Sequence, residues 1–205
     1  MKHNPSIAPI VVESERVIAE AIKHFGLKTK PANIVVTVQS KGRKNALGWF
    51  GPEYWGKPAK VEAVHEINLS AECISAACGE TLIHELAHAE NQTLGIKDCS
   101  NRIHNKHFKV MAERLGLEVK PRDKAVGFGF TDLGPEAKKF LEKIAFKHAL
   151  FNVHRLTHHG FARAVGGTRL LKASCPDCGY TVRVTQKWID VGLPVCPCGE
   201  TLEVA

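Results

Sequence analysis

The residues with the clearest chemical potential lie in the run TLIHELAHAEN, where His84 and His88 stand four positions apart. On a helix this spacing places both side chains on one face, with Cβ atoms about 5–6 Å apart, a separation that one zinc ion can bridge. Glu85 follows the first histidine and can act on zinc-bound water as a general base without coordinating the metal. We therefore expect a catalytic zinc site on a buried helix, rather than two core histidines that match the pattern by chance.

A catalytic zinc site usually has three protein ligands and one open position for water. The run SNRIHNKHF supplies candidates for the third ligand, because His104 and His107 follow the two histidines at some distance along the chain. Glu113 is a more distant candidate of the carboxylate type. His104 and His107 would share one face of a helix, so their spacing alone leaves the choice open.

Four of the seven cysteines stand close together near the end of the chain, at Cys175, Cys178, Cys196 and Cys198. Two cysteine pairs on tight turns are typical of a zinc ribbon, in which four thiolates hold a structural zinc ion. The second pair departs from the usual pattern because a single residue separates its cysteines. The alternative is a metal-free hairpin with reactive thiols, but so short a segment has too small a core to fold without a cross-link. We expect Trp188 in that small core.

Helical and strand patterns alternate along the chain and predict an α+β fold around the histidines. Apolar residues recur at helical spacing in 13–25, which Gly26 follows, and β-branched residues dominate 33–39. Alternating apolar residues in 61–70 predict a strand shortly before the histidine helix. We expect helices at 13–25, 72–93, 105–115 and 135–154, strands at 33–39 and 61–70, a loop at 121–134, and two short hairpins with cysteines at their tips in 171–205.

The distribution of charge favours a polyanionic partner. The net charge is +7, and residues 101–172 hold 15 lysines and arginines against 6 aspartates and glutamates. Such a segment favours contact with DNA, and the alternative is a solvated, lysine-rich helix face. We find no apolar run of membrane-spanning length and no signal peptide pattern, so we expect no membrane contact and a cytoplasmic protein with reduced thiols.

The histidine region resembles a known family. The run ETLIHELAHAEN, followed by GIKDCSNRIHNKHFKVMAERLGLE, is similar to the SprT-like metallopeptidases, which include the Spartan-type proteases of DNA–protein crosslinks. In that family an aromatic residue stands four positions after the third histidine, a pattern that His104 and Phe108 match. The resemblance therefore implies His104 as the third ligand. It also implies Asp98 as a hydrogen-bond partner of a ligand histidine, with capping of a loop as the alternative.

The same resemblance implies how the chain is organised. It predicts a zincin-like domain over 1–120, in which a small sheet packs on the HExxH helix. A basic helical linker over 121–170 and a zinc ribbon over 171–205 would follow. The implied cofactors are two zinc ions, one catalytic and one structural.

The implied reaction is hydrolysis of peptide bonds, in which Glu85 takes a proton from zinc-bound water and passes it to the leaving amine. His107, Arg102 and Tyr54 are candidate donors for the oxyanion, and nothing in the sequence chooses among them. The predicted strand 61–70 is expected to lie along the cleft and pair with an extended substrate.

Three functions fit these motifs. The leading expectation is a zinc-dependent endopeptidase that acts on DNA-associated or DNA-crosslinked proteins, with DNA contacted through 101–172. The second is a nucleic-acid-binding or transcription-associated zinc protein whose histidine site performs no catalysis. The third is an HExxH protease that cleaves a regulator of a mobile element.

Overall fold

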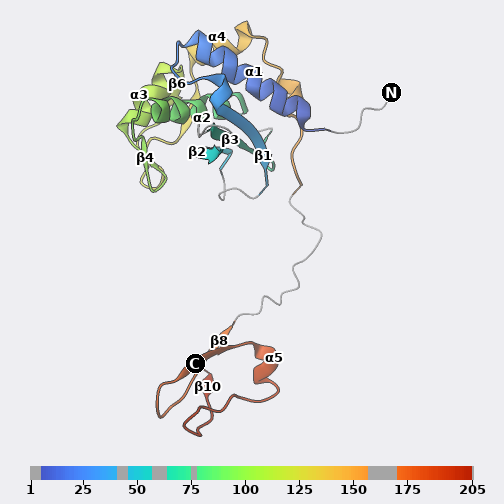
Figure 1. The fold of residues 1–205 in the computed structure, drawn as a ribbon, viewed down its shortest axis with the longest axis vertical. Coiled ribbons are helices and arrows are strands. Elements are labelled where there is room, and N and C mark those ends of the chain that lie inside the picture. The colour runs from blue at the N-terminus through green and yellow to red at the C-terminus, as the bar shows by residue number, and fades with distance from the viewer. Residues whose placement is uncertain (1–5, 41–45, 57–63, 75–77, 157–169, 205) are drawn as a thin grey trace, which may run out of the picture. The chain divides into compact units, whose positions relative to one another are not determined.

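The computed structural model in Figure 1 describes residues 6–40, 46–56, 64–74, 78–156 and 170–204. Contacts divide the chain into two compact units, residues 1–156 and 157–205, which are described separately. The first unit comprises α1 (Ala8–His24), the 3-10 helix η1 (Pro31–Asn33), β1 (Ile34–Gln39), β2 (Gly48–Trp55), β3 (Val64–Ser70), α2 (Cys78–Thr93), β4 (Cys99–Ser100), β5 (Ile103–His104), α3 (Lys106–Arg114), β6 (Leu117–Val119), β7 (Thr131–Leu133), α4 (Pro135–Lys143) and the 3-10 helix η2 (His148–Phe151).

A three-stranded sheet with the order β1-β3-β2 lies beside α1 and α2 in the first unit (Figure 1). β3 is central, since it pairs with β1 in parallel and with β2 in antiparallel orientation. In this register Val36 and Phe50 both lie opposite Ile67, and this face of the sheet packs into the core with α1 and α2. The prediction that strand 61–70 offers an edge to a substrate was therefore wrong. β2, which contacts α2, is an edge strand: among the described strands it pairs with β3 alone.

β2 is the element that the sequence least suggested. Its glycines and Pro52 are typical of turns, yet the chain is extended from Gly48 to Trp55. Proline is tolerated on an edge strand, where its missing N–H interrupts no ladder. The register against β3 is irregular between Gly51 and Trp55, and Glu53 adopts a left-handed φ of 56° within this irregular part.

α1 and α2 end where the glycines predicted. Gly26 (φ 61°) and Gly95 (φ 69°) follow their last turns, and the residue after each glycine donates its N–H to a helix carbonyl five positions back. Glycine adopts this left-handed conformation without steric cost and so closes the helix. α1 begins at Ala8, earlier than predicted, because Pro9 suits the first helical turn.

The core extends beyond the domain boundary that we expected at residue 120. α4 ends after nine residues, whereas the sequence predicted a helix over 135–154. Ala145 takes a left-handed φ of 50° just after the helix, and the chain then turns so that Phe146 and Phe151 join the core of α1 and α2. Burial of these two rings outweighs the helical preference of the segment.

The expected loop 121–134 contains a second departure from prediction, since β7 pairs with β6 in an antiparallel hairpin. The register places Leu117 opposite Leu133 and Val119 opposite Thr131.

Among the described helices, none combines the length and the apolar character needed to cross a bilayer.

The second unit is a small antiparallel sheet with the order β10-β8-β9. Cys175 and Cys178 lie at the turn between β8 and β9, and Cys196 and Cys198 lie in a turn closed by an isolated β-bridge between Val195 and Thr201. The elements of this unit are β8 (Leu171–Ser174), β9 (Thr181–Val184), α5 (Gln186–Ile189) and β10 (Glu203–Val204).

The core of the second unit consists of Ala173, Cys175, Cys196 and Leu202, with two valines packed against it. Trp188 lies outside this core with 58% of its surface exposed, so its predicted burial was wrong. α5 has only four residues and contributes no buried side chain, which leaves the indole on the surface, where the Lys187 ammonium lies 5.4 Å from its ring.

Candidate metal centres

α2 brings three of the predicted site residues into one buried place. His84, Glu85 and His88 lie in its middle, where nearly the whole surface of the helix is covered by the rest of the unit. The two histidines are 9% and 8% exposed and Glu85 is 6% exposed. Four-residue spacing on a helix accounts for the approach of the two imidazoles.

A short hairpin brings His104 to the same place. β4 and β5 pair so that Cys99 lies opposite His104, and the two-residue turn between them has left-handed φ angles at Asn101 (47°) and Arg102 (71°). This is the backbone of a type I′ turn, which matches the twist of paired strands. The side chain of Asn105 then caps α3 by accepting the N–H groups of its first turn.

The Nε2 atoms of the three histidines converge. Nε2 of His104 lies 3.3 Å from Nε2 of His84 and 3.1 Å from Nε2 of His88. Two nitrogens that bind zinc tetrahedrally, each at about 2.0–2.1 Å, are about 3.3 Å apart. The spacing of these atoms therefore fits a single ion of that kind, and the three side chains could hold a metal.

The opposite nitrogens fix the protonation of the rings. Nδ1 of His88 lies 2.7 Å from the Asp98 carboxylate, and Nδ1 of His104 lies 3.0 Å from the Val126 carbonyl. Both oxygens only accept, so each Nδ1 carries the proton and each neutral ring leaves Nε2 with a free lone pair. Lone pairs this close repel one another, and a cation between them removes the repulsion.

His84 has the same arrangement through a hydroxyl group. Its Nδ1 lies 3.0 Å from Oγ1 of Thr131, and Thr131 donates its own hydroxyl proton to the Glu80 carboxylate. The threonine oxygen must then accept from Nδ1 of His84, which again leaves Nε2 unprotonated.

Burial keeps the imidazoles of His84 and His104 neutral near pH 7. The pKa of His84 is well below its usual range, first because of burial and then because His88 and His104 are close. Burial, followed by the closeness of His88, lowers the pKa of His104 to about 4. Burial raises the pKa of Asp98, but the hydrogen bonds from His88 and Asn91 and the nearby imidazoles outweigh that effect and lower it overall. An ionised Asp98 and neutral imidazoles are the forms that a metal site requires.

Phe108 forms the floor of the histidine cluster. Its ring centroid lies 4.6 Å from those of His84 and His88 and 4.5 Å from that of His104, and the side chain is fully buried. Phe50 of β2 lies against the other side of His88, with ring centroids 6.3 Å apart. Aromatic packing therefore restricts how the imidazoles can turn.

The alternative third ligands lie elsewhere. His107 is exposed in the first turn of α3, where its backbone N–H is bonded to the Asn105 side chain. Glu113 is exposed near the end of the same helix, with its carboxylate 3.6 Å from the Lys109 ammonium. Neither belongs to the group of converging ligand atoms, whereas His104 does.

β2 runs past the Glu85 side chain. A Cβ atom at Gly48 would lie 3.6 Å from Cγ of Glu85 and only 2.6 Å from both a Thr81 methyl group and the Asn68 carbonyl oxygen. Only glycine allows the strand to approach α2 this closely. The side chain of the general-base candidate thus lies against the backbone of the edge strand.

Two of the candidate oxyanion donors, Tyr54 and Arg102, are exposed side chains. Tyr54 is 62% exposed and folds back over Gly51, while Arg102 lies at the exposed tip of the β4–β5 hairpin. His65 on β3 is tied to β2, because its Nδ1 accepts the backbone N–H of Glu53 at 3.2 Å.

Three contributors to the histidine cluster escaped sequence reasoning: Glu80, the carbonyl of Val126, and Thr131. A carbonyl has no side-chain signal, and Thr131 lies 47 positions from His84. The glycine-rich run VGFGF, just before Thr131, is the signal that would have pointed there.

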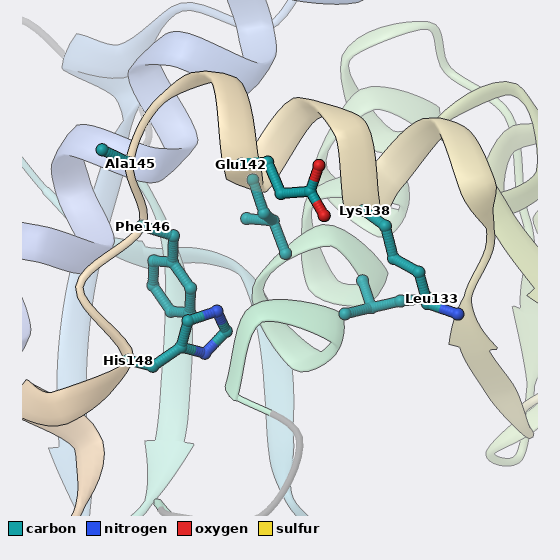
Figure 2. Close-up of a pocket in the computed structure, with 7 residues that line it drawn as sticks. Leu133, Lys138, Glu142, Ala145, Phe146 and His148 are labelled. Carbon is teal, nitrogen blue, oxygen red and sulfur yellow. The ribbon is translucent and has the colours of Figure 1, made fainter.

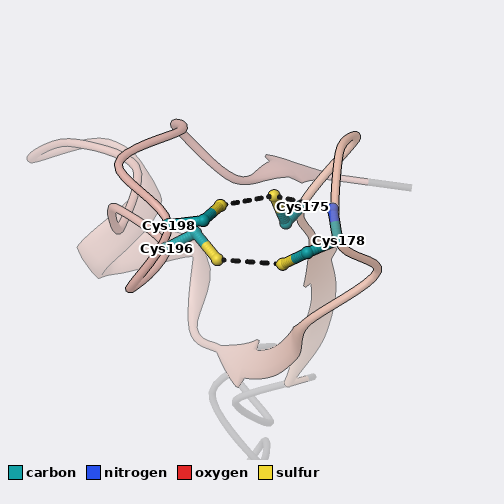
Figure 3. Close-up of side chains that lie close together, drawn as sticks. All are labelled: Cys175, Cys178, Cys196 and Cys198. Carbon is teal, nitrogen blue, oxygen red and sulfur yellow. Dashed lines mark hydrogen bonds between the residues drawn. The ribbon is translucent and has the colours of Figure 1, made fainter.

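The four cysteines of the second unit also converge (Figure 3). The sulfur of Cys175 lies 3.5 Å from that of Cys198, and the sulfur of Cys178 lies 3.3 Å from that of Cys196. These distances exclude disulfide bonds, which are about 2.0 Å long, and approach the roughly 3.8 Å between two sulfurs on one tetrahedral zinc ion. The four thiols could therefore hold a metal.

The turns of this cluster supply hydrogen bonds to the sulfurs. The backbone N–H of Glu200, followed by the neighbouring thiols, lowers the pKa of Cys198 to about 7. Gly179 (φ 72°) and Gly199 (φ 100°) follow the two pairs in conformations that favour glycine. The shortened second pair still brings both of its sulfurs to those of the first pair.

The first unit also has a surface pocket of about 340 Å³ (Figure 2). It is formed where α4 ends, with Leu133, Phe146 and His148 among its lining residues. It shares no residue with either group of metal-binding side chains.

Comparison of the chain with protein-family models, with curated protein sequences and with solved structures found no match in any of the three.

Proposed function

We propose that the chain is a zinc-dependent endopeptidase of the SprT-like kind, with His84, His88 and His104 as ligands of the catalytic zinc. The observation that carries this proposal is the convergence of three imidazole Nε2 atoms at the buried part of α2 that also holds Glu85. Zinc bound there would polarise a scissile carbonyl and acidify a water molecule.

Glu85 is the general base of the proposed reaction. It follows His84 directly on α2, so it lies beside the ligands without being one of them. It takes a proton from the attacking water and delivers it to the leaving amine. Burial in this part of the core holds the carboxylate in one place relative to the imidazoles.

The edge of β2 supports a polypeptide substrate. An extended chain can add to such an edge through main-chain hydrogen bonds, which are independent of sequence. Because Gly48 brings β2 against Glu85, a peptide bound along this edge passes the general base. An extended protein segment fits this arrangement better than a compact small molecule.

The decisive experiment is the Glu85→Gln substitution in the zinc-loaded full chain, assayed on an unfolded protein substrate. We expect a loss of hydrolysis of about 10²–10⁴-fold, with zinc content unchanged. Glu113→Gln, an exposed change on α3, serves as the control and should cleave at the wild-type rate. Hydrolysis that survives Glu85→Gln would refute the proposal.

The four cysteines are proposed to hold a structural zinc ion in a zinc ribbon. Four protein ligands fill a tetrahedral shell and leave no position for water, so this ion takes no part in hydrolysis. Cys175 and Cys196 are also half of the small core, which links metal binding to folding of the unit.

A second candidate function, binding of DNA, is favoured by exposed cations beside the histidine cluster. The loop that leads from α2 to His104 lies beside the loop between β6 and β7, since the backbone of His104 forms a β-bridge with Gly127. Within the described parts of the chain, none of the cations on these loops has an ion-pair partner. They are Lys97, Arg102, Arg122 and Lys124, and Lys106 at the start of α3 is unpaired among the described residues as well.

Other basic residues of the segment 101–172 are less available. Lys109 and Lys139 each pair with a carboxylate on their own helix, at 3.6 and 3.4 Å. Arg155 contacts the Ser40 hydroxyl. Arg163 and Arg169 lie outside the described residues.

DNA binding is tested by its dependence on salt. The affinity for a duplex should fall steeply as NaCl rises, and Lys106→Gln or Arg122→Gln should each reduce the slope by about one. Lys138→Gln on α4 is the control and should leave the slope unchanged. A flat response to salt would exclude these loops as the contact, and DNA binding without proteolysis would favour a non-catalytic zinc protein.

A further inference from the structure

We propose that the segment Val126–Thr131 is a positioning element of the histidine cluster and that Gly129 and Thr131 set its affinity for metal. The inference rests on the metal site of the proposed function, and it is independent of whether that site hydrolyses peptides. The segment contacts two of the three ligands, His104 at one end and His84 at the other.

The first end holds His104 by both its backbone and its ring. The Val126 carbonyl accepts the backbone N–H of His104 at 2.9 Å and its Nδ1–H at 3.0 Å. The N–H of Phe128 donates to the His104 carbonyl at 3.1 Å. These bonds fix the tautomer of the ring and the direction in which Nε2 points.

Gly129 leaves room for the His104 ring. A Cβ atom there would lie 2.5 Å from Nδ1 and 2.7 Å from Cε1 of that ring, which is closer than carbon atoms approach in proteins. The backbone of Gly129 does not lie in the left-handed region, so any residue could adopt it. The need for glycine therefore comes first from the imidazole, and the Val126 carbonyl oxygen, 3.1 Å from such a Cβ, is the next neighbour. Gly127 differs, because it has a φ of 65° and would clash with the His104 backbone.

The other end of the segment holds His84 through a hydroxyl. The Thr131 hydroxyl oxygen accepts a hydrogen bond from Nδ1–H of His84, and the same hydroxyl donates to the carboxylate of Glu80, which stands one helical turn before His84 on α2. A carboxylate at the end of this chain makes the threonine oxygen a better acceptor and strengthens its hold on the ring.

Both ends of the segment are anchored. His104 and Gly127 form a β-bridge at the start, and Thr131 pairs with Val119 in the β6–β7 hairpin at the end. Phe130 stands between the two contact points, and its side chain is 56% exposed. Phe130 is therefore a matched control: its substitution should leave metal affinity unchanged, whereas substitution of Gly129 or Thr131 should lower it.

Cobalt(II) binding to the full chain tests the inference, because only thiolate ligands give a charge-transfer band and the two clusters can be followed separately. We expect Thr131→Val, which keeps the shape and loses the hydroxyl, to weaken binding at the histidine cluster by about 10–100-fold. Thr131→Ser, which keeps the hydroxyl, should bind within a few-fold of wild type. Gly129→Ala should weaken binding at least as much as Thr131→Val, and Phe130→Ala should have no effect.

Equal affinity of the Thr131→Val variant and the wild type would overturn the inference. So would a Thr131→Ser variant as weak as Thr131→Val, since that result indicates packing and not hydrogen bonding. If Gly129→Ala prevents folding, as judged by circular dichroism, the two Thr131 variants still decide. A wild-type protein that binds cobalt as expected but cleaves no protein would refute the peptidase and leave this inference standing.

Discussion

The histidine cluster and the cysteine cluster both fit one metal ion, but they relate to folding in opposite ways. The histidines lie in a large core, on the fully buried ring of Phe108, with every Nδ1 held by the protein. The cysteines lie in a core of four residues, two of which are Cys175 and Cys196 themselves. The first unit can therefore form its site before metal binds, whereas the second has little to fold around without metal.

The ligands also differ in charge. The imidazoles of His84 and His104 stay neutral because burial lowers the pKa of both. Thiols must lose protons to bind metal, and four thiolates repel one another strongly unless a cation lies between them. An open, preformed site suits chemistry, and a closed, metal-dependent site suits stability.

The largest expected effect is that of a strong chelator. Structural zinc contributes about 10–16 kcal/mol in zinc-finger peptides, far more than so small a core can supply. Removing metal should therefore unfold the second unit and leave the first folded. Amide NMR spectra would show loss of dispersion for residues 170–204 and retention for β3. Retained dispersion in the second unit would contradict the claim that this unit needs metal to fold.

Single ligand substitutions should separate the two sites. His104→Ala and Cys196→Ser are each expected to reduce bound zinc by one ion per chain. Only Cys196→Ser should expose its unit to proteolysis, because the first unit keeps its core without metal. Elemental analysis and limited digestion of both variants measure this. Unfolding of the first unit by His104→Ala would contradict it.

Truncation of the cluster floor tests how far the first unit depends on packing. Phe108→Ala should lower the free energy of unfolding by about 3–5 kcal/mol, since it removes a fully buried ring that contacts three imidazoles. Val110→Ala on the same helix is 66% exposed in the parent and should change stability by no more than about 0.5 kcal/mol. Urea unfolding of both variants provides the measurement, and equal effects would count against a packed floor.

The smallest effect is expected at Trp188. Its indole is 58% exposed, so Trp188→Ser should change the stability of the second unit by no more than about 0.5 kcal/mol. Leu202→Ala removes a fully buried side chain from the same unit and should cost about 2–5 kcal/mol. Thermal unfolding of the metal-loaded chain compares them, and a large effect at Trp188 would mean that the indole supports the unit.

Local patterns were informative where a single periodicity decided the result. The spacing of His84 and His88 on an apolar helix needs no tertiary information, and Gly26 and Gly95 mark helix ends through their own backbone preference. The sequence did not indicate β2, because its glycines and proline are typical of turns and only pairing with β3 makes the chain extended. The predicted end of α4 was wrong because the burial of Phe146 and Phe151 overrides helical propensity.

The sequence by itself determined the helix with His84, Glu85 and His88 and the two cysteine pairs, because the chemistry of those residues follows from short, regular spacings. Only the tertiary structure brought His104 together with them and left His107 on the surface. One helical turn separates these two histidines in the sequence, and a hairpin, a carbonyl and a glycine decide between them. The contacts of Thr131 and Val126 depend on residues far apart in the chain, which no local pattern encodes.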